Sequence, residues 1–294
     1  MGSLGTGFRV GHWTDDHSMT GCTVVLPPAG NVASCDIRGS SPGSREIESL
    51  KASKRLNEIH GLLLTGGSAF GLGAADGVMA WLSEKGVGYR TPAARIPIVP
   101  TAVVFDLGTA VAAWPHAEHA RAACEDAAET VVTGRVGVGT GCTVGKWAGR
   151  EYGAPGGLGL AEVEEDGHRV AALAAVNAIG DVVDEDGSTI AGTSASDPRF
   201  WQPPPDEGRL GSNTVLAVLA TDARLDKRDV RFLAARGSDG VTVAVRPAHT
   251  RYDGDVVFAI AAPPESSGSP PSVDILGILA TKAVAQAVRN AVRG

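Results

Sequence analysis

Asn213 and Thr214 stand where a polar loop rich in Pro and Gly changes directly into a block of six apolar residues, 215–220. A short apolar block bounded by polar residues is typical of a buried strand, so Thr214 would open that strand. A cut between Asn213 and Thr214 would place a hydroxyl nucleophile and an α-amine on one residue. The amine, with an ordinary pKa of roughly 7.7 to 8.0, can act as the general base for that hydroxyl. The alternative is a turn residue followed by the first residue of a strand, and the dipeptide alone does not decide.

Lys146 and Asn177 are polar residues in surroundings that are otherwise apolar or rich in Gly. A lysine in such a turn can polarise a carbonyl or tune a nucleophile, whereas the alternative is a solvated cation at a loop tip. Asn177 lies in the middle of the apolar segment 170–184, which we predict to be one long strand. A buried amide without partners costs roughly 1 to 3 kcal/mol. Asn177 is therefore either a structural clasp or a donor to an oxyanion.

Asp253 and Asp255 come just before the apolar segment 256–261, another predicted strand. Two carboxylates two residues apart at the mouth of a strand point the same way and repel each other, which raises the pKa of one of them. An acid/base pair and an Asx-turn both remain open.

Gly66, Gly67 and Phe70 belong to a glycine turn between an apolar strand and a helix. Unpaired backbone N–H groups in such a turn can bind an anion or an oxyanion, although close packing of helix on strand explains the glycines equally well. A nucleophile elbow would need Gly in place of Phe70. The glycine run 134–145 is no P-loop, since that motif needs Gly at Thr140 and Ser or Thr at Trp147.

Composition limits the class of protein. The 294 residues carry a formal net charge of -7 without a Lys/Arg cluster, which argues against a nucleic-acid-binding surface and favours cationic or neutral small substrates. Four cysteines without CxxC spacing fit a reduced cytoplasmic protein. With no leader pattern and no apolar run of 18 residues, neither export nor membrane insertion is expected. His116 and His119 could bind a metal, but they lack partners at ligand spacing, so we expect surface histidines and neither metal nor cofactor.

The hydrophobic pattern predicts alternating strands and helices. Strands are expected within 8–26, at 35–39, 61–65 and 215–220, and as an edge or bent strand at 96–107. Helices are expected at 45–57, after the glycine turn up to Gly86, at 226–235 and at 273–292. The Pro-rich segment 193–211 is the one clear linker, and exposed loops of this kind tolerate cleavage.

The motifs taken together resemble one family over nearly the whole chain and in the family's order. It is the self-processing P1 or DmpA-type aminopeptidase family, which includes L-aminopeptidase/D-esterase, β-peptidyl aminopeptidases and endo-type 6-aminohexanoate-oligomer (nylon-oligomer) hydrolases. The matching segments are GLLLTGGSAFGL at 61–72, IPIVPTAVVFDL at 96–107, GRVGVGTGCTVGKWAG at 134–149, AAVNAIGDVVD at 174–184, NTVLAVLATDA at 213–223 and HTRYDGDVVFAI at 249–260.

The resemblance implies an α/β (α+β) fold, an αββα sandwich of the N-terminal-nucleophile type that ornithine acetyltransferase shares. It implies one catalytic domain, 1–294, cleaved into an α-chain, 1–213, and a β-chain, 214–294, and assembled as a homo-oligomer of αβ units. The substrate would be a small peptide or amide. An acyltransferase like ornithine acetyltransferase, or a binding protein without turnover, are the alternatives.

The resemblance also assigns roles to residues. Thr214 matches the nucleophile, for which many relatives use Ser. Lys146 and Asn177 match polar residues of the catalytic centre, and Asp253 with Asp255 matches the acidic or hydroxyl pair that supports the nucleophile. Phe70 is a departure, because some relatives have Tyr there and this chain lacks that hydroxyl.

Overall fold

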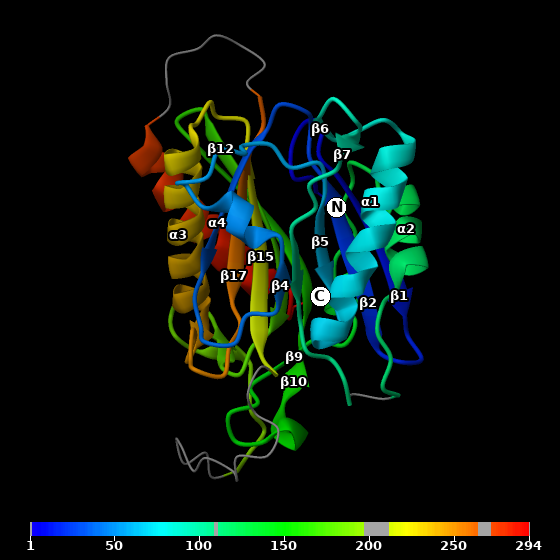
Figure 1. Ribbon diagram of the computed structural model, residues 1–294. Coiled ribbons are helices and arrows are strands. Elements are labelled where there is room, and N and C mark those ends of the chain that lie inside the picture. Colours follow the sequence, from blue (N-terminus) through cyan, green and yellow to red (C-terminus); the bar gives the residue numbers. More distant parts are fainter. Residues whose placement is uncertain (1, 109–110, 197–211, 264–271, 294) are drawn as a thin grey trace.

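The computed structural model describes residues 2–108, 111–196, 212–263 and 272–293. Two five-stranded sheets face each other, and two helices cover the outer face of each sheet (Figure 1). The molecule is thus the αββα sandwich that the resemblance implies.

The first sheet holds the predicted nucleophile. Its strands, in spatial order, are β11 (Gly157–Glu165), β12 (His168–Asn177), β15 (Thr214–Thr221), β17 (Val256–Ala261) and β3 (Val32–Ile37). Neighbouring strands are antiparallel except for β15 and β17, which run parallel. Helices α3 (Lys227–Ala244) and α4 (Val273–Asn290) cover this sheet. The strand β15 therefore lies at the centre, with a neighbour on each edge and protein on each face.

The second sheet is built in the same way. Its strands are β1 (Arg9–Asp15), β2 (Thr20–Leu26), β5 (Leu62–Thr65), β8 (Thr101–Val103) and β4 (Ser44–Arg45), and α1 (Ala75–Glu84) and α2 (Ala117–Asp126) cover its outer face. Smaller ribbons join β9 (Thr143–Val144) to β10 (Ala154–Pro155) and β6 (Tyr89–Arg90) to β7 (Arg95–Ile96). A third small sheet contains β14 (Thr189–Ala191), β13 (Asp181–Val183) and β16 (Val245–Arg246).

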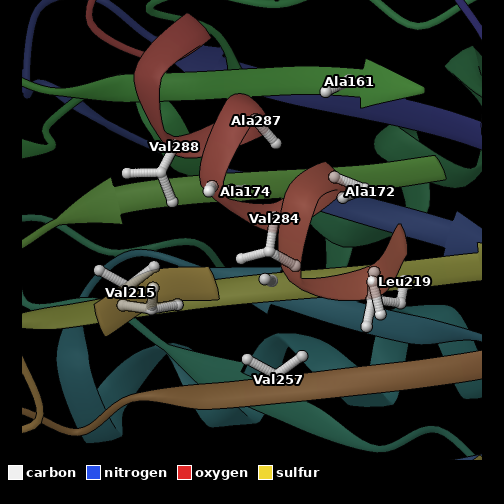
Figure 2. Packing of buried hydrophobic residues seen from close by; sticks show 14 of the residues in the cluster. Ala161, Ala172, Ala174, Val215, Leu219, Val257, Val284, Ala287 and Val288 are labelled. Carbon is white, nitrogen blue, oxygen red and sulfur yellow. The ribbon is translucent and has the colours of Figure 1, made fainter. Parts of the chain in front are cut away.

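Side chains along the central strands point alternately to the two faces of the sheet, which explains how the helix and sheet layers pack. In β15, Val215, Ala217 and Leu219 pack toward the helices, whereas Leu216, Val218 and Ala220 pack into the core between the sheets. A strand with apolar residues on both faces is stable only when both faces are covered. Figure 2 shows the helix side, where Val284, Ala287 and Val288 of α4 lie over the small side chains of β12 and β15.

Three predicted elements were wrong. The helix expected at 45–57 is only a 3-10 turn, Ile47–Leu50, because the carbonyl groups of Ser49, Lys54 and Leu56 accept hydrogen bonds from Lys227 Nζ instead of from the next helical turn. The helix expected to end near Gly237 continues to Ala244. Gly237 and Gly240 lie within α3, where an added Cβ would clash with residues of β15, β17 and α4, so both serve close packing.

The third wrong element is the strand expected over 170–184. The chain forms β12 and then the separate β13, so Asn177 is the last residue of a strand and not its middle. Gly180 marks the break, since a Cβ there would lie 2.2 Å from the carbonyl oxygen of Pro247. The block 96–107 is bent, as expected, but β8 is an interior strand between β5 and β4.

Candidate functional site

The Asn213–Thr214 peptide lies at the start of the central strand β15. Thr214 pairs with Asn177 of β12, and Asn213 forms a parallel bridge with Asp253, which precedes β17. Both residues of the peptide are buried. The central strand thus fixes the position of Thr214 from both sides, as a nucleophile requires.

Two donors point at the carbonyl oxygen of Asn213. The backbone N–H of Gly254 donates to this oxygen at 2.9 Å, and the hydroxyl of Thr214 donates to it at 2.5 Å. The hydroxyl is therefore held against the peptide group that it would attack during self-cleavage. The Gly254 N–H would also stabilise negative charge that develops on this oxygen.

Lys146 is buried beside the end of β12. Its Nζ donates to the backbone oxygen of Asn177 at 3.1 Å and to Asn177 Oδ1 at 2.8 Å. Burial lowers the pKa of Lys146 to about 7. The reading of Lys146 as a solvated cation at a loop tip was wrong, and this amine changes charge near neutral pH.

Asn177 connects four segments. Its Oδ1 accepts from Lys146 and from the backbone N–H of Thr143 at 3.0 Å, while its Nδ2 donates to Phe105 O at 2.9 Å and to Ser212 O at 3.5 Å. These bonds make Asn177 a clasp. The contact with Ser212 is long, and its acceptor lies two residues before Thr214.

The two aspartates have different partners. Asp253 Oδ2 accepts from the Thr250 hydroxyl at 2.6 Å and from the Thr250 backbone N–H at 2.8 Å. Asp255 Oδ1 accepts from the backbone N–H of Val215 at 2.6 Å, and its Oδ2 lies 2.7 Å from His249 Nδ1. Burial, and then the charge of Asp255, raises the pKa of Asp253 to about 6. The repulsion expected between the two carboxylates contributes to the raised pKa of Asp253, but burial contributes more.

His249 was missed by the sequence reading, although it opens the segment 249–260. Its Nδ1 faces Asp255, and its Nε2 lies 2.9 Å from the carbonyl oxygen of Ser238 in α3. Burial alone would lower the pKa of His249, but the hydrogen bond and charge of Asp255 outweigh it, and the pKa is raised. A carbonyl oxygen only accepts, so both ring nitrogens donate when the ring is an imidazolium paired with a carboxylate.

The backbone N–H groups of Gly66 and Gly67 in the glycine turn are hydrogen-bonded to acceptors within the protein. Gly66 N donates to Gly21 O at 2.9 Å, and Gly67 N donates to Asp106 Oδ1 at 2.7 Å. Asp106 is buried and also accepts from Thr20 at 2.7 Å, and burial raises its pKa. In this structure, then, neither N–H group of the turn is free to bind an oxyanion, and the two glycines make room for Asp106 and its neighbours.

Phe70 lies on the surface beside this turn. Its side chain is 62% exposed and its ring stacks on Trp114, with 4.6 Å between ring centroids. The pair offers an apolar face to solvent and no hydroxyl group. His116 and His119 are also accounted for, because they form the N-terminal cap of α2 and His119 stacks on Trp13.

The described ranges, 2–108, 111–196, 212–263 and 272–293, contain no group of three or more His, Cys, Asp or Glu residues placed to hold a metal ion. None of the helices found in them is long and apolar enough to cross a bilayer.

Comparisons with known proteins match this geometry to a family. The model of peptidase family S58 matches residues 6–294. An uncharacterized aminopeptidase of Mycobacterium tuberculosis is 38% identical over 291 residues, covering 88% of this chain and 82% of that protein. A 6-aminohexanoate-oligomer endohydrolase of Paenarthrobacter ureafaciens is 28% identical over 270 residues, covering 86% and 72%.

A solved structure shows the same fold. The L-aminopeptidase D-Ala-esterase/amidase of Ochrobactrum anthropi, described as a variant of the Ntn hydrolase fold, aligns with a TM-score of 0.73 at 20% identity. The alignment covers 98% of this chain and 85% of that one. With the family model matched over almost its entire length, this chain is a hydrolase that belongs to peptidase family S58.

Proposed function

We propose that this protein is a self-cleaving amidohydrolase whose nucleophile is Thr214 and which hydrolyses amide bonds of small peptides or amino-acid amides. One observation carries the proposal: the Thr214 hydroxyl and the Gly254 N–H both donate to the Asn213 carbonyl oxygen. These contacts place Thr214 Oγ1 beside the carbonyl group that it would attack, and they place the Gly254 N–H where it would stabilise the resulting oxyanion.

Self-cleavage then proceeds in two steps. Thr214 Oγ1 attacks the carbonyl carbon of Asn213, the C–N bond breaks as the nitrogen takes a proton, and an ester joins Asn213 to the Thr214 oxygen. Water hydrolyses this ester, which leaves a carboxylate on Asn213 and a free amine and hydroxyl on Thr214. Residues 1–213 and 214–294 become the two chains.

Turnover uses the groups that self-cleavage releases. The α-amine of Thr214 takes the proton of the hydroxyl as it attacks the substrate carbonyl. Departure of the Asn213 carbonyl frees the Gly254 N–H, and we assign this group and Asn177 Nδ2 to the substrate oxyanion. The assignment replaces the Gly66 and Gly67 N–H groups, which bind acceptors at 2.9 and 2.7 Å, whereas one Nδ2 hydrogen of Asn177 makes only the 3.5 Å contact with Ser212 O.

The charged residues position these reacting groups. Asp255 anchors the N–H of Val215, and both of its oxygens already have partners, which favours the α-amine over Asp255 as the base. Lys146 has a pKa of about 7 and carries a positive charge below it. This charge disfavours protonation of the new amine, because like charges repel each other. The amine therefore stays basic near neutral pH.

Intact-mass analysis of the purified protein tests the proposal. We expect two chains from the wild type, ending at Asn213 and starting at Thr214, one uncleaved chain from Thr214→Ala, and retained cleavage in Thr214→Ser. Thr221→Ala is the matched control, because Thr221 lies at the other end of β15. A wild type that remains one full-length chain would contradict the proposal. Hydrolysis of aminoacyl p-nitroanilides by the processed protein, absent from Thr214→Ala, tests turnover.

A further inference from the structure

A cavity of about 460 Å³ is lined in part by Thr143 and Gly153, two residues that contact the Asn177 and Lys146 side chains. The residues that matter for its chemistry are Arg135, Thr143, Arg150, Glu151 and Gly153. The ribbon of β9 and β10 forms one wall, and Figure 1 shows the two strands side by side below the sheets. A volume of this size accommodates a substrate of one or two amino-acid residues.

Three contacts connect the cavity to the proposed catalytic centre. Thr143 lines it and donates its backbone N–H to Asn177 Oδ1. Gly153 also lines it, and a Cβ at this position would lie 3.1 Å from Lys146 Cγ. Asn177 in turn pairs with Thr214 across β12 and β15. A molecule in the cavity is therefore one layer of side chains from the nucleophile.

Arg150 lines this cavity, and no ion pair joins it to an acidic residue within the ranges that the structure describes. Its guanidinium carbon lies 4.9 Å from the ring centroid of Phe105, and the carbonyl oxygen of the same Phe105 accepts from Asn177 Nδ2. Arg150 is exposed, and burial of part of its side chain lowers its pKa. A guanidinium that no described carboxylate neutralises is available to bind an anion.

Arg135 adds a second positive charge to the cavity. Neither arginine forms an ion pair in the parts of the chain that the structure describes, and Glu151 is the one acidic residue among those lining the cavity. The carboxylate of Glu151 lies beside Gly149, where a Cβ would be 2.6 to 2.8 Å from it. The cavity therefore has an excess of positive charge in a protein whose net charge is -7.

We propose that this cavity binds a carboxylate of the substrate through Arg150, with Arg135 adding to the attraction, so that peptides carrying a carboxylate near the scissile amide are preferred over neutral analogues. This inference rests on the proposed function and names its substrate class. The planar guanidinium fork of Arg150 matches a carboxylate in two parallel hydrogen bonds, which a lysine cannot reproduce.

Matched substrate pairs identify the source of the carboxylate. The first pair is a dipeptide and the same dipeptide with an amidated C-terminus, which differ only at the leaving group. The second pair is glutamyl and glutaminyl p-nitroanilide, which differ only in the side chain of the acyl residue. For each pair the measured quantity is the ratio of kcat/KM for the acid to kcat/KM for its neutral analogue.

We expect wild type to prefer the acid of at least one pair, and Arg150→Gln to lower that ratio by roughly 10- to 100-fold, mainly through KM, as loss of a hydrogen bond to a charged group predicts. Arg150→Lys should keep part of the preference that Arg150→Gln loses. Arg135→Gln should lower the ratio less than Arg150→Gln does. Arg90→Gln is the control, because Arg90 is exposed in the β6 and β7 ribbon. Intact masses establish beforehand that each variant is processed.

Each outcome has a definite meaning. A ratio that falls only for the first pair assigns the carboxylate to the leaving group, and one that falls only for the second pair assigns it to the acyl side chain. Ratios that are the same in wild type, Arg150→Gln and Arg135→Gln would overturn the inference and leave the proposed function intact. A processed wild type that hydrolyses none of the four compounds would overturn both.

Discussion

Replacing His249 with Asn should destabilise the protein by an amount that depends on pH. His249 has a φ of 54°, and Asn adopts this left-handed conformation more readily than most residues, so the backbone is preserved. Asn keeps an amide near Asp255 Oδ2 but is neutral, and it is too short to replace the bond from His249 Nε2 to Ser238 O.

The magnitude follows from these two bonds. A hydrogen bond to a charged group contributes about 1.5 to 3 kcal/mol and a neutral one about 1 kcal/mol, so exchanging the first kind for the second costs about 1 kcal/mol. Loss of the Ser238 bond costs about 1 kcal/mol more. Because the pair is buried, with side-chain exposures of 13% for His249 and 3% for Asp255, solvent screens it little. We expect the variant to lose about 2 kcal/mol of unfolding free energy at pH 6.

The sign of the pH dependence distinguishes an imidazolium from a neutral ring. The pKa of His249 is raised by Asp255, while the nearby Arg38 opposes this effect. A raised pKa in the folded state gives a stabilisation that is complete below the unfolded pKa and disappears as pH rises through the folded pKa. The difference between wild type and variant should therefore be largest at pH 6 and fall to about 1 kcal/mol or less at pH 9.

Urea unfolding in the Thr214→Ala background measures the effect, because an uncleaved chain avoids the separation of two chains on unfolding. His60→Asn is the control with the opposite sign. His60 Nδ1 accepts from Ile98 N, and burial lowers its pKa, so its stabilisation is lost as pH falls and should be larger at pH 9 than at pH 6. An equal loss at both pH values in His249→Asn would refute the charged pair.

Two variants test the proposed mechanism in the processed enzyme. Asn177→Asp keeps an oxygen for Lys146 and Thr143 but removes the amide donor, so kcat should fall by roughly 10²- to 10³-fold with little change in KM; an unchanged kcat would mean that Asn177 is only a clasp. Lys146→Met removes a charge that disfavours protonation of the Thr214 amine, so the acidic limb of the kcat/KM profile should move upward by roughly one pH unit. An unmoved limb would show that Lys146 does not tune the amine.

The elements of this fold that sequence predicts best are those whose apolar pattern is continuous. The block 215–220 and the segment 256–261 became β15 and β17, and the stripe from 273 onward became α4. Elements interrupted by polar or glycine residues were predicted less well. At 45–57 the reason is a tertiary contact, since the lysine that binds the carbonyl groups there, Lys227, is far away in the sequence.

The same distinction applies to the site. Thr214, Asn177, Lys146, Asp253 and Asp255 attract notice because polar residues are rare in apolar surroundings, and the structure places them around one strand end. What sequence does not reveal is which partner each of them has. The Gly254 N–H belongs to a backbone, which carries no signature of residue type, and the His249 contact with Ser238 depends on how α3 packs.

In the proposed mechanism, the charges around Thr214 allow a buried nucleophile to be reactive. Burial raises the pKa of Asp253 to about 6 and lowers the pKa of Lys146 to about 7, so both groups change charge near neutral pH. The negative charge of Asp255 is paired with His249. The proposed cleavage would add an amine whose ordinary pKa is roughly 7.7 to 8.0. Desolvation and the charge on Lys146 lower that pKa, whereas the charge on Asp253 raises it. Because each of these groups titrates within a narrow range, the protonation of any one depends on the others, and the pH profile of the enzyme belongs to the cluster and not to Thr214 alone.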